Sequence, residues 1–450
     1  MPQSFDLIVV GTGSAASTVA SACSTKGWKV AVIDSRPFGG TCALRGCDPK
    51  KVLVGAAEAI DWNQRLNGKE ILQGHPRIEW PALMRFKRTF TDPVPEEREK
   101  RFSKQGIKSF HGRVRFTGPL KVRVGSGNLE GRYVLVAAGS KPMRLGIPGE
   151  DHLTTSDQFL DLEALPPRIV FIGGGYISME FAHVAARAEA RVTVLHRGEQ
   201  ILPGFDPDLT KLLAERTRGL GVDLHLQTNV EAIEKSGGGF KVMANQKGKK
   251  VAFETEMVVH GAGRVPEIED LDLATAGVKT GTKGVSVNEY LQSVSQPNVY
   301  AAGDAAASGG LPLTPVASYE GNIVAANLLE GNHIKPDYRG IPTVAFTTPP
   351  VASVGLSEKA AREHGLKFKV NHADTSGWYS SRRIAETCSG FKVLIEEESG
   401  LILGAHLLGP HAEEIINFFA LAIRSGISVG ELKQTIFSYP THASDIQYML

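Results

Sequence analysis

Short apolar runs that end at glycines recur along the chain and predict β-strands. Residues 5–10 lead into GTGSAAS, and residues 169–172 lead into GGGYIS. An apolar β run that meets glycines opening a helix is the start of a βαβ unit. Each segment continues through a helical stretch into a second apolar strand, KVAVID ending at Asp34 and ARVTVLHR ending near Arg197. The pattern therefore predicts two Rossmann-like halves, each with a nucleotide site.

Three further β runs end in glycine and predict strands that finish at a ligand crevice. They are YVLVAAGS near Gly139, MVVHGAGR near Gly263 and NVYAAGDAAA near Asp304. From about residue 336 the pattern changes to the longer β stretches IPTVAFTTPPVASVG, FKVLIEEES and LILGAHLLG, followed by the amphipathic helix HAEEIINFFALAIRSG. We expect an α/β fold of two Rossmann-like domains with a C-terminal α+β domain.

Two other patterns are interpreted without a function. Residues 80–108 form a charged helix-like segment, most simply a solvated face. The glycine runs at 237–239 and 309–310 predict a hairpin turn and a loop.

Composition narrows the class of partner. The 450 residues carry 50 Lys and Arg against 48 Asp and Glu, a net charge of +2, so no overall field gathers nucleic acid or an anionic membrane. Small molecules are the expected partners. The N-terminus lacks the features of a signal peptide, which predicts a cytoplasmic location. No apolar run reaches the roughly 18 to 20 residues that cross a bilayer.

The first glycine motif predicts a pyrophosphate site. Gly11 permits the tight turn, Gly13 allows close approach of the backbone, and Ala16 keeps helix and strand together. The helix N-terminus then faces the phosphates. Asp34 stands where a carboxylate can accept from ribose hydroxyls.

The second motif contains Gly173, Gly175 and Ser178 in the roles that Gly11, Gly13 and Ala16 have in the first. It lacks the carboxylate expected at the end of the following strand. His196 stands where an NAD-binding carboxylate is expected, and Arg197 follows. A cation there can pair with a 2′-phosphate, which favours NADPH over NADH. The alternative is a solvated arginine after a strand.

The most specific pattern is GGTCALRGCDPKK, with Cys42 and Cys47 five residues apart. In a regular helix their Cα atoms would lie about 8.6 Å apart, beyond the roughly 7 Å that a disulfide bridges, so the helix must be distorted. Gly46 can adopt the backbone conformation of a kink at little energetic cost. The nearby cations Lys50 and Lys51 would lower the pKa of a cysteine thiol. A metal site or two idle buried thiols are the alternatives. Metal binding is disfavoured because no second Cys or His pair has ligand spacing.

With these motifs the chain resembles the class I pyridine nucleotide-disulfide oxidoreductases, the family of glutathione reductase, dihydrolipoamide dehydrogenase and mercuric reductase. The segments GGTCALRGC, VLVAAGSKP, IGGGYISMEFA, GAGRVP, VYAAGDAAA, LTPVASYEGNIVAANL and IPTVAFTTPPVASVGLSEKAA carry the resemblance over nearly the full length. It implies FAD, a pyridine nucleotide and a homodimer. The implied domains are FAD-binding at 1–148 and 266–335, NAD(P)H-binding at 149–265, and dimerisation at 336–450.

The resemblance also implies roles for single residues. Cys42 would attack a small or protein-bound disulfide, and Cys47 would lie against the flavin. Lys50 or Lys51 would pair with Glu180, and Tyr176 would cover the nicotinamide pocket. The remaining implied cofactor-binding residues are Ser14, Ala15, Gly40, Thr41, Gly112, Gly139, Asp304, Thr314 and Ala317 for FAD, and Ile177 and Gly263 for the nucleotide.

One departure falls at the C-terminus. The family's disulfide reductases place a His-Pro-Thr motif there, whose histidine serves the partner subunit's dithiol, whereas this chain reads SYPTHASDIQYML with Tyr439 at that place. A phenol is a poor base at pH 7, so the usual proton carrier is missing. His442 lies three residues on and Asp445 six, and a backbone rearrangement could bring the His442 imidazole into play. His442 is equally compatible with an ordinary surface or interface histidine.

Three functions therefore compete. The first is an NADPH-dependent disulfide reductase with an active site shared between subunits. The second is a mercuric-type metal-ion reductase, which Tyr439 favours and the lack of terminal cysteines disfavours. The third is a flavin redox sensor or interaction protein of low turnover. The segment GWYSSRR, residues 377–383, could bind an anionic or aromatic substrate or form part of an interface.

Overall fold

The computed structural model describes residues 2–450 and divides them into two compact units. The first unit comprises the residues up to Lys50 together with Phe86–Met143 and Arg264–Tyr338. The second comprises Lys51–Arg85, Arg144–Gly263 and Arg339–Leu450.

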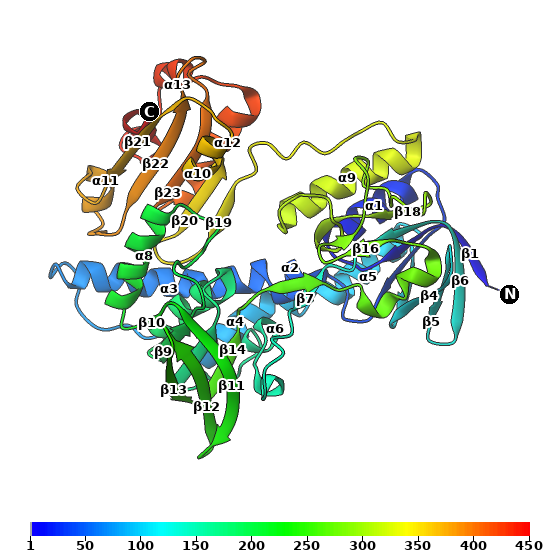
Figure 1. Cartoon of the computed structure of the whole chain (residues 1–450), viewed down its shortest axis with the longest axis horizontal. Helices are drawn as coiled ribbons and strands as arrows, with labels where there is room; N and C mark the ends of the chain where they lie inside the picture. The colour runs from blue at the N-terminus through cyan, green and yellow to red at the C-terminus, as the bar shows by residue number, and fades with distance from the viewer. Residues whose placement is uncertain (1) are drawn as a thin grey trace. The chain divides into compact units, whose positions relative to one another are not determined.

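A parallel sheet forms the centre of the first unit (Figure 1). Its strand order is β3-β2-β1-β6, with β18 also parallel to β6, and the antiparallel strands β5 and β4 extend it. Val10, at the end of β1, pairs with Ile33 of β2 and Val136 of β6, so these strands end at one edge. The strands are β1 (Gln3–Val10), β2 (Val30–Asp34), β3 (Lys108–His111), β4 (Val114–Gly118), β5 (Lys121–Val124), β6 (Gly127–Val136) and β18 (Val299–Ala301).

Helices α1 and α9 lie against each other beside this sheet. Their close approach depends on small residues, since a Cβ at Gly321 would lie 3.0 Å from the Ala15 carbonyl oxygen. The other elements of the unit are short. The unit contains α1 (Ser14–Thr25), α2 (Gly40–Arg45), α5 (Val94–Lys104), α9 (Thr314–Glu330), and the strand pairs β7 (Ser140–Pro142) with β15 (Arg264–Pro266) and β16 (Thr280–Gly281) with β17 (Gly284–Val285).

The second unit contains the other Rossmann-like sheet, with parallel order β10-β9-β8-β14. A three-stranded antiparallel sheet β11-β12-β13 follows β10 in the chain. The elements are β8 (Arg168–Ile172), α7 (Tyr176–Arg187), β9 (Arg191–Leu195), α8 (Pro207–Gly219), β10 (Asp223–His225), β11 (Thr228–Ser236), β12 (Gly239–Gln246), β13 (Lys249–Thr255) and β14 (Met257–His260), preceded by α6 (Ser156–Phe159).

The C-terminal part of the second unit is an antiparallel sheet, β19-β20-β23-β22-β21, with α12 against β20 and β23. Apolar residues of α12, among them Ile416 and Phe419, are buried there. The elements are β19 (Thr343–Ala345), β20 (Val351–Gly355), α10 (Glu358–Glu363), β21 (Phe368–Asp374), α11 (Tyr379–Arg382), β22 (Gly390–Glu396), β23 (Ile402–Leu408), α12 (Ala412–Ser425), α13 (Val429–Gln434) and α14 (Ile446–Met449).

These sheets confirm the predicted architecture of two Rossmann-like domains and a C-terminal α+β domain. The predicted turn at the glycines 237–239 joins β11 to β12. The run at 341–355 forms two short strands rather than one long one. The predicted strand ending near Arg197 stops at Leu195.

The interpretation of residues 80–108 as a solvated face is wrong in part. The segment forms α4 (Trp80–Thr91) and α5, in which Met84 and Phe102 are fully buried and Lys87 is buried. Both helices are amphipathic: the apolar side chains of one face are buried, while the many charged side chains of the segment give its sequence a solvated appearance.

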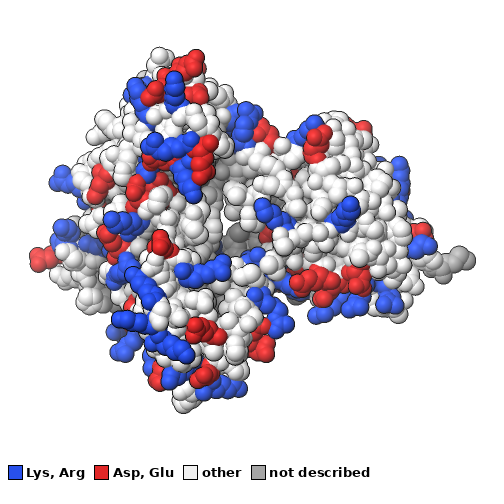
Figure 2. Space-filling view, viewed as in Figure 1, with Lys and Arg blue, Asp and Glu red and all other residues white. Residues whose placement is uncertain are grey.

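Surface charge agrees with the near-neutral composition. Lys and Arg side chains are interspersed with Asp and Glu over the face drawn in Figure 2. A helix with the length and apolar character needed to traverse a bilayer does not occur within residues 2–450.

Candidate active site

The two cysteines of the CALRGC motif stand on either side of a break between two helices. Helix α2 ends at Arg45, Gly46 adopts φ −144° and ψ −112°, and α3 (Cys47–Asn67) begins at once. The break supplies the distortion that the spacing requires, because it lets the Cys42 and Cys47 thiols meet within hydrogen-bonding distance. Both are free thiols in this structure.

The surroundings make the two thiols unequal. A hydrogen bond from Cys42 lowers the pKa of Cys47 to about 6, and contributions from Thr314 and Lys50 act in the same direction against the effect of burial. The Thr314 hydroxyl lies 3.5 Å from the Cys47 sulfur. For Cys42 the same hydrogen bond, together with burial, raises the pKa above its ordinary value. The favoured state is a Cys47 thiolate beside a neutral Cys42 thiol.

The loop between β1 and α1 has the shape of a pyrophosphate cradle. Gly11 has φ +110°, and a Cβ there would lie 2.3 Å from the Ala137 carbonyl oxygen. Gly13 precedes α1, and a Cβ on Gly40 would lie 2.4 Å from the Gly13 Cα. This loop and the start of α2 therefore touch backbone to backbone, which requires glycine on the α2 side.

Carboxylates at the strand ends are held by short polar contacts. Thr12 Oγ1 donates to Asp34 Oδ2 at 2.7 Å, and the Arg36 amide donates to Asp34 Oδ1 at 3.0 Å. Ser140 Oγ donates to Asp304 Oδ2 at 2.7 Å. Each carboxylate oxygen has two acceptor sites, so both groups can still accept from a ligand hydroxyl. The donors and glycines of the first unit fit FAD.

The second glycine loop has the same conformation. Gly173 has φ +107°, and its Cβ would lie 2.3 Å from the Gly261 carbonyl oxygen. Gly175 precedes α7. The ring of His196 leaves no room for a Cβ at Gly174, whereas Arg197 is exposed. The loop fits a nucleotide pyrophosphate, with Arg197 in solvent beyond the end of β9.

Residues of α7 contact β19 and the residue that follows it. Tyr176, the first residue of α7, shares a hydrogen bond of 2.6 Å between its hydroxyl and Thr343 Oγ1. The buried carboxylate of Glu180 accepts from the Phe346 amide at 2.8 Å. Lys51 forms an ion pair with Glu58 at 2.9 Å. It also lies over the Phe346 ring at 4.7 Å.

In the C-terminal segment, Tyr439 is exposed whereas the ring of His442 is partly buried. The Tyr439 side chain is 78% exposed. The His442 ring packs against His411 at an interplanar angle of 54° with 4.8 Å between centroids, and its Nε2 is buried without a hydrogen-bond partner among residues 2–450. Burial, with the nearby His411 and Arg383, lowers the pKa of His442 to about 4. Burial raises the pKa of Asp445, against a hydrogen bond from Ser380.

The other predicted site residues lie at strand ends and helix starts. Ser14, Ala15 and Ala16 begin α1, Thr41 lies in α2, Gly112 follows β3, Gly139 follows β6, Ala317 lies in α9, Ile177 lies in α7 and Gly263 follows β14. Residues of the FAD set and the cysteine pair belong to the first unit, whereas Glu180, Arg197, Tyr439 and His442 belong to the second.

Sequence reasoning missed one side chain at the cysteine pair. The Cys42 sulfur lies 3.8 Å from Asp48 Oδ1, in reach of a weak S–H···O hydrogen bond. Asp48 directly follows Cys47, so its position in the motif was the available signal.

Comparisons with known proteins agree with this geometry. The family model for pyridine nucleotide-disulphide oxidoreductases matches residues 5–321, and the model for the dimerisation domain of the same family matches residues 341–450. The chain belongs to the class I pyridine nucleotide-disulfide oxidoreductases.

Proteins similar to this oxidoreductase are named for several activities. It is 32% identical over 449 residues to glutathione reductase from Burkholderia cepacia, covering 98% of this chain and 97% of that one. It is 30% identical to mercuric reductase from Staphylococcus aureus, covering 98% and 81%. Among solved structures, the HOCl-induced flavoprotein disulfide reductase RclA from Escherichia coli superposes with a TM-score of 0.87 at 25% identity, covering 99% of each chain. The oxidoreductase is thus a flavoprotein that uses a pyridine nucleotide and carries a dimerisation domain.

Proposed function

We propose that this oxidoreductase uses NADPH to reduce a small or protein-bound disulfide through Cys42 and Cys47. The observation that carries the proposal is the asymmetry of the pair: a thiolate at Cys47 and a neutral thiol at Cys42. The two sulfurs can therefore take different parts in exchange, with the Cys47 thiolate ready to resolve a mixed disulfide formed at Cys42.

The exchange needs two steps at this pair. In the first, the Cys42 sulfur attacks one substrate sulfur, the substrate S–S bond breaks, the Cys42 proton passes to the departing substrate thiolate, and Cys42 is left in a mixed disulfide. In the second, the Cys47 thiolate attacks the Cys42 sulfur, closes the Cys42–Cys47 disulfide and expels the second thiolate. The substrate gains two electrons and the dithiol loses them.

We propose that Asp48 positions the Cys42 thiol and does not remove its proton, because a carboxylate is a poor base toward a thiol. The Asp48 carboxylate lies 3.8 Å from the Cys42 sulfur. Its charge also helps to raise the thiol pKa, so the proton stays on sulfur until the attack. Tyr439 is a weak base, and the lowered pKa of His442 makes it a poor proton acceptor, although both are proposed to act at the partner protomer's dithiol in the homodimer.

The cofactors are assigned to the two glycine loops. When bound, FAD would pass an electron pair from the nicotinamide to the Cys42–Cys47 disulfide. Gly11, Gly13, Asp34 and Asp304 would hold it in the first unit. For the nucleotide, Gly173 and Gly175 would hold the pyrophosphate, Arg197 would select the 2′-phosphate, and Tyr176 would cover the nicotinamide site.

An anaerobic titration tests the proposal. NADPH added to the oxidised protein is expected to produce the long-wavelength absorbance of a thiolate beside the flavin, followed by turnover on some member of a panel of disulfides. Cys47→Ser should abolish that absorbance, and Cys42→Ser should retain it but abolish turnover. Bleaching of the flavin without the band would overturn the dithiol mechanism, and the band without turnover would favour the redox sensor.

A second candidate is reduction of a thiophilic metal ion. It is supported by the tyrosine at position 439 and by the similarity to mercuric reductase. Thiolates that bind a metal ion need no base. Mercuric ion should then oxidise NADPH faster than any disulfide does, and Cys42→Ser should remove that activity. Oxidation that survives Cys42→Ser would exclude both candidates as written.

A further inference from the structure

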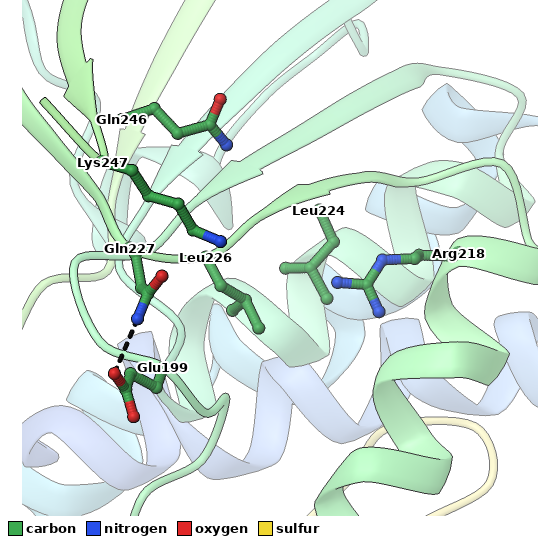
Figure 3. A pocket seen from close by; sticks show the side chains of 7 residues that line it. All are labelled: Glu199, Arg218, Leu224, Leu226, Gln227, Gln246 and Lys247. Carbon is green, nitrogen blue, oxygen red and sulfur yellow. Dashed lines mark hydrogen bonds between the residues drawn. The ribbon is translucent and has the colours of Figure 1, made fainter. Parts of the chain in front are cut away.

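A cavity beside the edge strand of the second Rossmann sheet lies outside the proposed chemistry. Its volume is about 530 Å³, within the roughly 300 to 1,000 Å³ typical of small-molecule sites. It is bounded by β10, by the C-terminal end of α8 and by the turn between β12 and β13 (Figure 3). The lining residues are Glu199, Arg218, Leu224, Leu226, Gln227, Gln246 and Lys247.

Two cations point into this cavity. Arg218 reaches it from α8 and Lys247 from the β12–β13 turn, and their charged ends approach the same space from opposite sides in Figure 3. Within residues 2–450 neither side chain forms an ion pair or hydrogen bond. Two unpartnered cations directed at one cavity provide the donors that a doubly charged anion requires.

The rest of the lining determines where that anion can sit. Leu224 and Leu226 lie between the two cations and form an apolar floor. The one carboxylate, Glu199, accepts from Gln227 Nε2 at 2.6 Å, away from Arg218. Gln246 donates to His225 Nδ1 at 3.1 Å, which fixes its amide. The cavity therefore has a cation on each side of an apolar floor, and its one carboxylate lies away from Arg218.

We propose that this cavity binds a small organic phosphate, with the phosphate between Arg218 and Lys247 and the uncharged body on Leu224 and Leu226. The lining contains no residue of the nucleotide loop at Gly173–Gly175, although Glu199 lies two residues after Arg197 in the chain. It is connected to Arg197 through the backbone, since the Gln227 amide donates to the Gly198 carbonyl at 2.9 Å.

The probe is phenyl phosphate, titrated calorimetrically into the FAD-loaded protein with saturating NADP⁺ to keep the probe out of the dinucleotide site. One site per chain with Kd below about 1 mM is expected. Inorganic phosphate, phenol and benzoate should each bind at least about tenfold more weakly, because each lacks the apolar body, the anion or the second charge.

Substitutions assign the binding to this cavity. Arg218→Gln and Lys247→Gln should each weaken phenyl phosphate binding about tenfold or more, because each removes a charge-assisted contact. Lys250→Gln, an exposed lysine of the same hairpin outside the lining, is the matched control and should leave binding unchanged. Absence of phenyl phosphate binding, or binding that both cavity variants retain, would overturn the proposal. Benzoate binding as tightly as phenyl phosphate would overturn the choice of phosphate.

Discussion

At the residue scale, Cys47 owes its low pKa first to a neighbouring thiol. The hydrogen bond from Cys42 is the largest contribution, ahead of Thr314 and Lys50. A hydroxyl can replace that donor, whereas a methyl group cannot. The identity of residue 42 should therefore control the protonation of residue 47.

Cys42→Ser should keep the pKa of Cys47 near 6, and Cys42→Ala should raise it by at least one unit, because only serine still donates to the thiolate. The pH dependence of iodoacetamide alkylation measures it. Since a depressed thiol pKa places the thiolate above that pH, the serine variant should react at its full rate from about pH 7 upward. Equal Cys47 pKa values in the two variants would show that the hydrogen bond from residue 42 does not lower the Cys47 pKa.

The sequence identified the two cysteines, and the family resemblance implied a role for each, but the local sequence did not show which sulfur has the lower pKa. Their spacing requires a helix break, and Gly46 supplies it. The 3.8 Å contact with Asp48 and the 3.5 Å contact with Thr314, which is 267 residues further along the chain, depend on folding.

At the scale of elements, the start of α2 rests on the first glycine loop. Gly40 has φ +74° and no room for a Cβ against Gly13. Gly106, in the turn after α5, has φ +73° and open space around it. The two glycines share the backbone requirement and differ only in packing.

Gly40→Ala should lower the free energy of unfolding by about 3 kcal/mol or more and reduce the FAD content of the purified protein. Gly106→Ala should lower the free energy of unfolding by only about 1 kcal/mol and leave the FAD content unchanged. The reason is that alanine there is disfavoured only by the left-handed backbone conformation and meets no neighbouring atom. Urea unfolding and the flavin absorbance ratio measure both. Equal losses in the two variants would contradict the close approach.

A buried ionic cluster joins α3, α7 and α8 within the second unit. The Asp61 carboxylate accepts from Arg187 at 2.6 Å, Arg216 at 2.8 Å and Arg65 at 2.8 Å. Burial opposes its ionisation, but the three arginines hold the pKa of Asp61 below its ordinary value. Arg187 also donates to the Thr348 carbonyl, so the cluster fixes the segment after β19.

Asp61→Asn should lower the free energy of unfolding by about 3 to 5 kcal/mol, because it leaves buried arginines uncompensated. Glu363→Gln, which breaks the exposed pair with Lys359, should cost less than about 1 kcal/mol. Because the folded pKa of Asp61 is depressed, its contribution is present above about pH 4 and lost as the pH falls. Asp61→Asn should therefore be less sensitive to acid than the wild type in urea titrations from pH 7 to pH 3.

At the scale of the whole molecule, the C-terminal domain exposes apolar side chains. Leu421 on α12 is 58% exposed and Ile436 is 95% exposed. The domain belongs to the family's dimerisation domain. Exposed apolar side chains in such a domain are expected to be covered by a second copy of the chain.

Leu421→Asp should shift the protein from dimer to monomer in sedimentation and reduce turnover, because Tyr439 and His442 are proposed to act on the partner protomer. Val370→Asp, at an exposed valine on the edge strand β21, should leave the dimer intact. A monomeric Leu421→Asp protein with full activity would contradict the shared site.

The sequence by itself determined the two glycine loops, the cysteine pair, the fold class and the family, because each depends on a local pattern of strand, turn and helix. Tertiary structure decided what these patterns contact. It buried Lys87 and Phe102 in a segment that reads as charged, ended β9 before Arg197, and placed Asp48 beside Cys42. Arg218 of α8 and Lys247 of a hairpin further along the chain also line one cavity. Burial and charge pairing depend on residues far apart in the chain, so only the folded structure brings these partners together.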